Sequence, residues 1–175
     1  LEVNAEVVRQ LNSGMSHVDD ISNQKVSEML RAGFTAATDP GVIRDAEAVV
    51  ICVPTPLLTN GGPDLAHLEH AAKVTSEHLQ PGQLIVLEST TYPGTTEEVL
   101  IPILEESGMR SGSDFHVAFS PERIDPGNKT FGIRNTPKVV GGVNENSTKE
   151  ATDFYERFID EVVPARGVRE AELAK

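Results

Sequence analysis

The 175-residue sequence predicts an α/β fold built on a doubly wound parallel sheet. The first observation is a series of apolar runs without polar alternation, which is typical of strands covered on both faces. The second is that segments with helical periodicity separate these runs, so that strands and helices alternate along the chain. Because strands joined by helices form parallel sheets with right-handed crossovers, helices are expected on both faces of the sheet.

The start of the chain predicts two short helices. Asn4 and Ser22 are suited to cap them, and Gly14 and Gly33 stand where they would stop. Their inward faces would consist of Val7, Val8 and Leu11 in the first helix and of Val26, Met29 and Leu30 in the second.

Five later segments are expected to form the core sheet. Residues 48–53 are the clearest strand, because they are apolar throughout and Pro54 ends them. The other expected strands are residues 84–87, 115–119, 136–142 and 162–163. Residues 1–3 and 34–36 are shorter strand candidates near the start of the chain.

Helices are expected between these strands. One would carry Leu65, Leu68, Ala72 and Leu79 on a single face. The next two would begin at capping boxes, the first formed by Thr95 and Glu98 and the second by Ser147 and Glu150. Their inward residues would be Val99, Leu100, Ile103 and Leu104 in one helix and Ala151, Phe154, Tyr155 and Phe158 in the other. Residues 169–175 begin a further helix.

Composition narrows the classes of partner and compartment. The 15 basic and 27 acidic residues give a net charge of −12, which argues against nucleic acid or an anionic membrane as the main partner. No apolar run approaches the roughly 20 residues that cross a bilayer, so a cytoplasmic protein is expected. The single cysteine, Cys52, excludes an internal disulfide and a cysteine-based metal site, and the five histidines show no ligand spacing, so no metal is expected.

Three polar loops follow successive predicted strands. They are Pro54-Thr55-Pro56, Ser89-Thr90-Thr91 and Ser120-Pro121-Glu122-Arg123. Since the carboxyl ends of parallel strands lie at one edge of a sheet, these loops are expected to line one crevice. Hydroxyls and backbone N–H groups ahead of helices suit phosphates or a ribose, and a carboxylate beside them could act as a base.

Each of these features has a simpler interpretation. The stretch 120–128, taken alone, is as well explained by a solvated, proline-rich turn as by a site. Cys52 is expected to be a buried core thiol and not a nucleophile, because it sits inside an apolar strand. The pairs Glu97-Glu98 and Glu105-Glu106 are expected to serve helix capping and solvation.

Five motifs in order resemble the UDP-glucose/GDP-mannose dehydrogenase family over essentially the whole sequence. They are Cys52-Val53-Pro54-Thr55-Pro56, residues 87–96, residues 120–128, Pro137-Lys138-Val139-Val140-Gly141-Gly142 and Ala171-Glu172-Leu173-Ala174-Lys175. The form Pro-Glu-Arg-Ile-Asp-Pro-Gly resembles members that act on UDP-N-acetylhexosamines more than those that act on UDP-glucose.

This resemblance implies an NAD-dependent, two-step oxidation of the carbon-6 alcohol of a UDP-sugar to the uronic acid, in polysaccharide biosynthesis. It also implies a Rossmann-like NAD-binding domain, a long connecting helix and a second domain for the UDP-sugar, in a homodimer. Residues 1–175 would form most of the first domain, truncated at both ends: no Gly-x-Gly-x-x-Gly occurs, and the family's nucleophilic cysteine would lie beyond Lys175.

The resemblance assigns roles by position. Glu2 would bind the adenosine ribose, and Pro54, Thr55, Ser89 and Thr90 would line the NAD crevice. The catalytic residues would be Thr90, which helps to hold a water, Glu122, which assists thioester hydrolysis, and Lys175, which stabilises the oxyanion.

Two matters stay open. Glu122 and Arg123 would contact the substrate. The second acid that is common in the glucose enzymes is replaced here by Pro126, and whether the adjacent Asp125 takes that role is the first open matter. The alternatives are a UDP-glucose 6-dehydrogenase and a non-catalytic nucleotide-binding or assembly domain.

Overall fold

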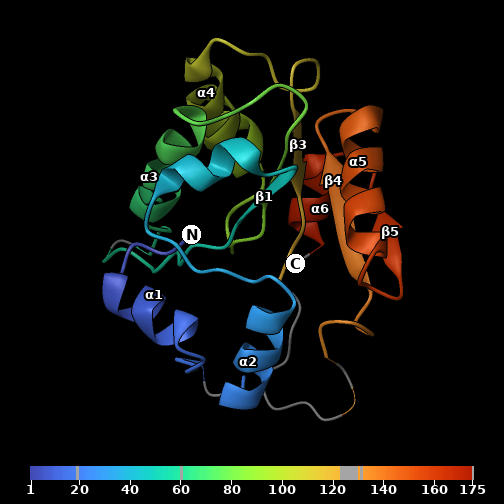
Figure 1. Ribbon diagram of the computed structural model, residues 1–175. Helices are drawn as coiled ribbons and strands as arrows, with labels where there is room; N and C mark the ends of the chain where they lie inside the picture. The colour runs from blue at the N-terminus through green and yellow to red at the C-terminus, as the bar shows by residue number, and fades with distance from the viewer. Residues whose placement is uncertain (19, 60, 123–129, 131, 175) are drawn as a thin grey trace. The chain divides into compact units, whose positions relative to one another are not determined.

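The computed structural model describes residues 1–18, 20–59, 61–122, 130 and 132–174 (Figure 1). The chain divides into two units, Leu1–Val42 and Ile43–Lys175, each of which is described by itself. A 3-10 helix, η1 (Pro40–Asp45), spans the boundary between them.

The first unit contains the helices α1 (Ala5–Asn12) and α2 (Asn23–Arg31). Both predicted caps are confirmed: the Asn4 side chain accepts a hydrogen bond from the Glu6 amide, and Ser22 accepts one from Lys25. Within the predicted inward faces, Val26 is buried, whereas Met29 is exposed.

The two strand candidates of the first unit are wrong, because neither 1–3 nor 34–36 forms a strand. The Asn12 side chain instead bonds both backbone groups of Ala36, donating to its carbonyl at 2.8 Å and accepting from its amide at 2.9 Å. A side-chain amide thus occupies the groups that a strand ladder would use. A single backbone bond, from Glu2 to the carbonyl of Ala37, joins the two segments.

The second unit contains a five-stranded sheet in the order β1-β2-β3-β4-β5. The strands are β1 (Ala48–Ile51), β2 (Leu84–Leu87), β3 (His116–Phe119), β4 (Lys138–Gly142) and β5 (Val162–Pro164). Strands β1, β2 and β3 are parallel neighbours, and β5 is parallel to β4, as predicted. The pair β3/β4 is antiparallel, which corrects the expectation of a wholly parallel sheet. The described part of residues 120–137 contains no helix, and an antiparallel return requires no helical crossover.

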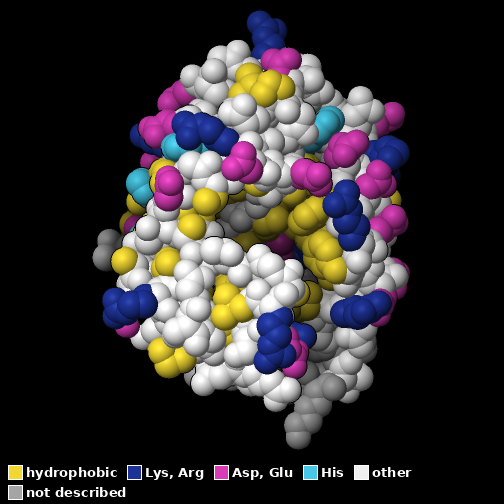
Figure 2. Space-filling model, in the orientation of Figure 1, with side chains coloured by type: hydrophobic (Ala, Val, Ile, Leu, Met, Phe, Trp, Pro, Cys, Tyr) yellow, Lys and Arg dark blue, Asp and Glu magenta, His cyan; other side chains and the backbone are white. Residues whose placement is uncertain are grey.

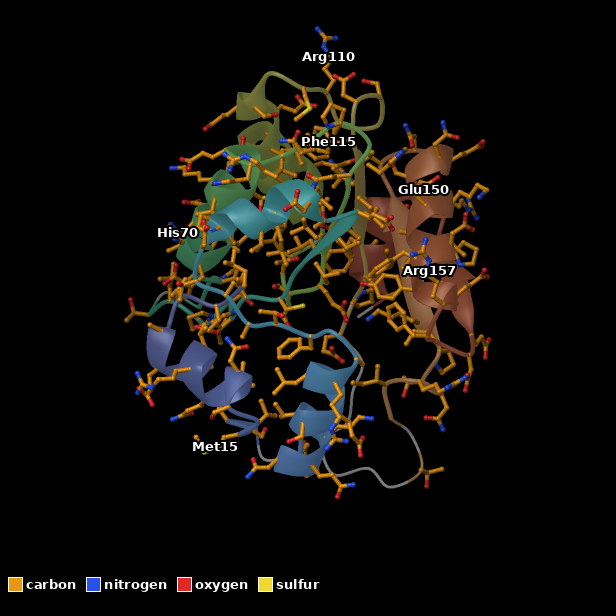
Figure 3. All side chains as sticks on the ribbon, in the orientation of Figure 1. Met15, His70, Arg110, Phe115, Glu150 and Arg157 are labelled. Carbon is orange, nitrogen blue, oxygen red and sulfur yellow. The ribbon has the colours of Figure 1, made fainter. Side chains whose placement is uncertain are left out.

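Helices cover both faces of this sheet, which confirms the doubly wound α/β prediction (Figure 1). One face packs against α3 (Ala66–Ser76), the π-helical turn η2 (Thr96–Leu100) with α4 (Ile101–Leu104), and α6 (Val168–Leu173). The other face packs against α5 (Glu145–Glu156). Alternate residues of β2 divide between these cores: Ile85 and Leu87 belong to the first, and Leu84 and Val86 to the second. Phe115, fully buried in the first core, is labelled in Figure 3.

Both predicted capping boxes are wrong. The Thr95 backbone is already helical, with φ −55° and ψ −40°, whereas an N-cap residue is normally extended. Its hydroxyl donates to the carbonyl of Tyr92 at 2.7 Å. In α5 the cap is Asn144, whose side chain accepts from the Ser147 amide at 2.8 Å, so this helix begins before the position expected. Phe158, predicted to face the core, lies beyond the end of α5 and is exposed.

The paired glycines that end β4 allow two helices to approach the sheet from opposite sides. A Cβ on Gly141 would lie 2.1 Å from the carbonyl oxygen of Gly167, directly before α6. A Cβ on Gly142 would lie 2.2 Å from the backbone nitrogen of Thr148 in α5. Since successive strand residues point to opposite faces, each helix requires a glycine of its own.

The surface over α5 mixes charges of both signs (Figure 2). Lys149 pairs with Asp153 one helical turn away, Glu150 projects from the same helix, and Arg157 directly follows it (Figure 3). In the part of the chain that the structure describes, no helix combines the length and apolar character needed to span a bilayer. Nor do the described His, Cys, Asp and Glu side chains form a group of three or more that could hold a metal ion.

Candidate functional site

The three predicted loops leave the same edge of the sheet. The strand register aligns Ile51 with Leu87 and Leu87 with Phe119, which are the last residues of β1, β2 and β3. The ladder continues one residue further, because the Glu88 amide donates to the carbonyl of Ile51 and the Ser120 amide donates to that of Leu87. The carboxyl ends of the three strands therefore meet as the sequence predicted.

Two hydroxyl groups join the first loop to the second. The buried Ser89 hydroxyl accepts a hydrogen bond from the Val53 amide at 3.0 Å. The Thr55 hydroxyl donates to the backbone carbonyl of Thr90. Pro54, between these two bonded positions, is exposed. The hydroxyls of Ser89 and Thr55 thus hold the two loops together, and their assignment to cofactor binding stays a prediction.

Thr91, in the loop after β2, carries a buried polar atom that stands out among the described residues. Among the described residues, its Oγ1 is a buried hydroxyl oxygen with no hydrogen-bond partner. Such an atom costs free energy unless a ligand or water bonds it, so its presence at this edge fits a bound polar group. The sequence showed three consecutive hydroxyl residues, Ser89, Thr90 and Thr91, but did not indicate which of them would lack a hydrogen-bond partner. Thr91 was therefore missed as an individual site residue.

A pocket of about 140 Å³ lies at the end of β3. Its lining residues are Glu88, Pro121, Glu122, Ile133, Thr136, Pro137 and Lys138. Glu122 is half-buried in this wall, two residues beyond Ser120, whose hydroxyl donates to the carbonyl of Val139. The predicted catalytic acid therefore borders a cavity and does not project from an isolated turn.

An ion pair that the sequence did not reveal forms part of this pocket. Lys138 pairs with Glu88, and both side chains are 13% exposed. The Tyr155 hydroxyl donates to the other Glu88 oxygen at 2.7 Å, and the Lys138 ammonium lies 4.9 Å from the centre of the Tyr155 ring. Burial, followed by the charge of Glu88, raises the pKa of Tyr155, so its hydroxyl remains a donor.

The reversed strand β4 explains why Lys138 is here. The antiparallel ladder pairs Ala118 with Gly142 and Phe119 with Gly141, so the first residue of β4, Lys138, lies beyond the end of β3, at the edge where the three loops emerge. A parallel β4 would have placed Lys138 at the opposite edge. A lysine opening one strand and a glutamate following another were visible in the sequence, but only the strand direction brings them together.

Comparison with known proteins identifies the family. Residues 1–159 match the model of the UDP-glucose/GDP-mannose dehydrogenase family, NAD binding domain. The chain belongs to this family. The resemblance seen in the sequence is thereby confirmed, and the description of the matched domain agrees with the predicted cofactor, NAD.

Individual relatives narrow the similarity within the family. The chain is 32% identical to the UDP-N-acetyl-D-mannosamine dehydrogenase of Pyrococcus horikoshii over 99% of the chain and 42% of that protein. It is 33% identical to the UDP-N-acetyl-D-glucosamine 6-dehydrogenase of Salmonella typhi over 99% of the chain and 41% of that protein. The crystal structure of an NDP-N-acetyl-D-galactosaminuronic acid dehydrogenase from Methanosarcina mazei superposes with a TM-score of 0.90 at 31% identity, over 100% of the chain and 39% of that structure. The chain spans about two fifths of the length of these relatives.

Cys52 differs from its prediction in one respect. It follows β1 and is exposed, so the expectation of a buried core thiol is wrong. Desolvation by neighbouring atoms, followed by the charge of Glu88, nevertheless raises the pKa of the Cys52 thiol to about 11. A thiol that stays protonated at neutral pH is a poor nucleophile, consistent with the expectation that Cys52 is not the family's reactive cysteine.

The remaining family positions divide between the first unit and the undescribed residues. In the first unit, the Glu2 carboxylate accepts a hydrogen bond from the Asn4 amide at 2.8 Å, directly before α1. Arg123, Asp125, Pro126 and Lys175 lie outside the described residues, so their predicted roles are not tested by the geometry.

Proposed function

We propose that this chain is the NAD-binding part of a dehydrogenase that oxidises the carbon-6 alcohol of a UDP-sugar to the uronic acid. UDP-N-acetylglucosamine and UDP-N-acetylmannosamine are the favoured substrates, because relatives at 32–33% identity are named for these sugars. The observation that carries the proposal is the position of Glu122, in a pocket at the sheet edge where the loops after β1 and β2 also emerge.

The loops after β1 and β2 form the proposed cofactor side of the site. The bonds between Ser89 and Val53 and between Thr55 and Thr90 hold the two loops together, so this side of the proposed site is preorganised. Thr91 offers a buried hydroxyl that a cofactor group or an ordered water can bond. When bound, NAD supplies the hydride acceptor for oxidation of the alcohol carbon.

Glu122 is the proposed base. From the pocket wall, its carboxylate can orient a water molecule and take its proton during hydrolysis of the acyl intermediate. Lys138 and Glu88 form an ion pair in the same wall, beside Glu122. The proposal keeps Thr90 as a residue that helps to hold the water, Lys175 as the group that stabilises the oxyanion, Glu2 at the ribose and Arg123 at the substrate.

The proposal extends to the whole protein. The relatives are more than twice as long as this chain, which is consistent with a Gly-rich turn, a connecting helix and a UDP-sugar domain elsewhere in the protein. We place the enzyme in the cytoplasm as a homodimer that serves polysaccharide biosynthesis, since UDP-sugars and NAD are cytoplasmic metabolites. Sedimentation of the full-length protein tests the dimer.

Enzyme assays of the full-length protein test the activity. With NAD, we expect UDP-N-acetylglucosamine or UDP-N-acetylmannosamine to yield two equivalents of NADH per sugar, faster than UDP-glucose does. Glu122→Gln is expected to lower kcat by about 10²-fold or more, because it removes the base. Glu106→Gln, at an exposed helix position, is the matched control. Binding of NAD and a UDP-sugar without any NADH formation would support the non-catalytic alternative instead.

A further inference from the structure

Glu172 makes an unusual set of buried contacts. Its side chain is only 5% exposed, although it lies in the short helix α6 close to the end of the chain. One carboxylate oxygen accepts from the Thr96 amide at 2.9 Å and from the Thr96 hydroxyl at 2.7 Å. The other accepts from the Gly94 amide. A carboxylate from one helix therefore binds the first residues of another.

These contacts replace the local cap that the sequence predicted. Thr95 cannot cap the helix because its backbone is already helical, so the amides of Gly94 and Thr96 need an acceptor from elsewhere. Glu172 supplies it across 76 residues of sequence. Its negative charge also lies at the positive end of the helix dipole, a favourable position. The helix opens with the π-helical turn η2, a geometry that often marks functional positions.

The capped segment is the loop that carries Thr90 and Thr91. This loop is fixed at its start, where the Ser89 hydroxyl binds the Val53 amide, and at its end, where Glu172 binds the Gly94 amide. Gly94 has φ +106°, a backbone conformation that favours glycine, and because glycine lacks a Cβ the chain can change conformation here if the contact is lost. The two threonines are thus held between two anchors, one of which belongs to α6.

Glu172 also stands three positions before Lys175 in the sequence. The Glu172 carboxylate joins α6 to the end of the Thr90–Thr91 loop. It would therefore also fix the position of the end of α6, which comes shortly before Lys175 in the sequence. At the surface, Arg169 of α6 pairs with Glu97 and Glu98 of η2, but those side chains are 41–60% exposed. Exposed ion pairs of this kind contribute little, so the buried hydrogen bonds of Glu172 are the main polar connection between α6 and the start of η2.

We propose that Glu172 is a positioning residue, which holds the Thr90–Thr91 loop and α6 together so that the groups on both elements are aligned for the dehydrogenase reaction. The inference rests on the proposed function. It distinguishes Glu172 from a residue that only stabilises the fold, because misalignment should slow the chemical step in protein that remains folded.

Steady-state kinetics of the full-length enzyme test this role. We expect Glu172→Gln to lower kcat by about tenfold or more, while KM for NAD and for the UDP-sugar stays within about twofold. The amide that replaces one oxygen would present a donor to a backbone donor, which breaks part of the contact. Thr96→Val is a milder second variant that removes one of the three bonds; it should lower kcat by less, and it covers the case in which Glu172→Gln does not fold.

Two neighbouring residues serve as controls. Glu170→Gln makes the same chemical change at an exposed position of α6, and Arg169→Gln breaks the exposed pairs between the same elements. Both are expected to keep kcat within about twofold of wild type. Hydrogen exchange supplies a readout besides activity: the Gly94 and Thr96 amides should exchange faster in Glu172→Gln and unchanged in the controls.

The outcomes separate this inference from the proposed function. Faster exchange together with a lower kcat at unchanged KM supports it. Normal kcat in folded Glu172→Gln, with or without faster exchange, overturns it while leaving the dehydrogenase proposal intact. If Glu172→Gln does not fold, a normal kcat in Thr96→Val overturns it. A wild-type enzyme that forms no NADH would refute the proposed function and this inference together.

Discussion

The second unit contains two carboxylates that are stabilised in different ways. Glu88, at the pocket, is 13% exposed and is neutralised by Lys138, with Tyr155 as a second donor. Glu172, against the start of η2, is 5% exposed, and its three hydrogen bonds come from neutral backbone and hydroxyl groups. Glu88 therefore sets the charge of a cavity wall, whereas Glu172 joins two elements of secondary structure.

This difference indicates what each residue contributes. An ion pair can be replaced by neutral groups of similar size without leaving an unpaired charge, as long as both partners change. A carboxylate that bonds backbone amides has partners that cannot be mutated away, so its loss leaves those amides buried and unsatisfied. We therefore expect Glu172 to be the less replaceable of the two.

The largest expected effect is that of Glu172→Ala. Removal of the side chain leaves two backbone amides and one hydroxyl without their acceptor, which should lower the free energy of unfolding by about 3 kcal/mol or more. Urea denaturation measures the change, with Glu170→Ala as the matched control on the same helix. Equal denaturation midpoints for the two variants would contradict the capping role.

The next effect is that of breaking the pocket ion pair from one side. Lys138→Met leaves Glu88 with a charge and, among the described residues, with the Tyr155 hydroxyl as its donor, which should cost about 2 kcal/mol of unfolding free energy. Adding Glu88→Gln to this variant removes the unpaired charge and should recover part of the loss. If the double variant is less stable than Lys138→Met alone, the pair is not acting as a neutral unit, and the contrast with Glu172 fails.

Sequence reasoning predicted the parts of the fold that depend on local pattern. The strands β1, β2 and β3 were found because they are short apolar runs between turn signals, and their parallel register then placed Thr55, Ser89 and Glu122 at one edge. The caps Asn4 and Ser22 were found because each bonds an amide only two or three residues away.

The parts that were missed depend on contacts distant in sequence. Lys138 and Glu88 are 50 residues apart and meet because β4 is reversed, which no local pattern in residues 120–137 indicates. Capping rules consider the few residues next to a helix start, so they selected Thr95 and could not find Glu172. Which of three adjacent hydroxyls lacks a partner among the described residues, as that of Thr91 does, depends on the packing around each side chain.

Removing a single hydrogen bond from Glu88 or from Glu172 tests the same difference between the two carboxylates, with a smaller expected effect. Tyr155→Phe removes one donor from Glu88, which keeps its lysine, and should cost about 1 kcal/mol. Thr96→Val removes one donor from Glu172, whose hydrogen bonds come from neutral groups. This change should lower the free energy of unfolding by about 2 kcal/mol. Thermal unfolding of the two nearly isosteric variants compares the sites directly. A larger loss in Tyr155→Phe would reverse the order of importance argued above.

The smallest expected effect is on the reactivity of Cys52, which senses the charge at the pocket but not the contacts of Glu172. Its thiol pKa is raised from 9.0 to about 11, first by desolvation and then by the charge of Glu88, while Lys138 lowers it. In this chain, whose only cysteine is Cys52, alkylation should be slow at neutral pH and should accelerate towards pH 11. Glu88→Gln should shift the pH profile of alkylation to lower pH and Lys138→Met should shift it to higher pH, whereas Glu170→Gln should leave it unchanged.

The same pKa shift affects stability. Because the pKa of the Cys52 thiol is higher in the folded chain than in the unfolded chain, the unfolded chain loses the thiol proton first as pH rises from 9.0 to about 11. This thiol therefore makes the fold less stable in that window and has no effect below it. A profile centred near 9.0, unmoved by either pocket variant, would show that Cys52 does not sense the Glu88–Lys138 pair.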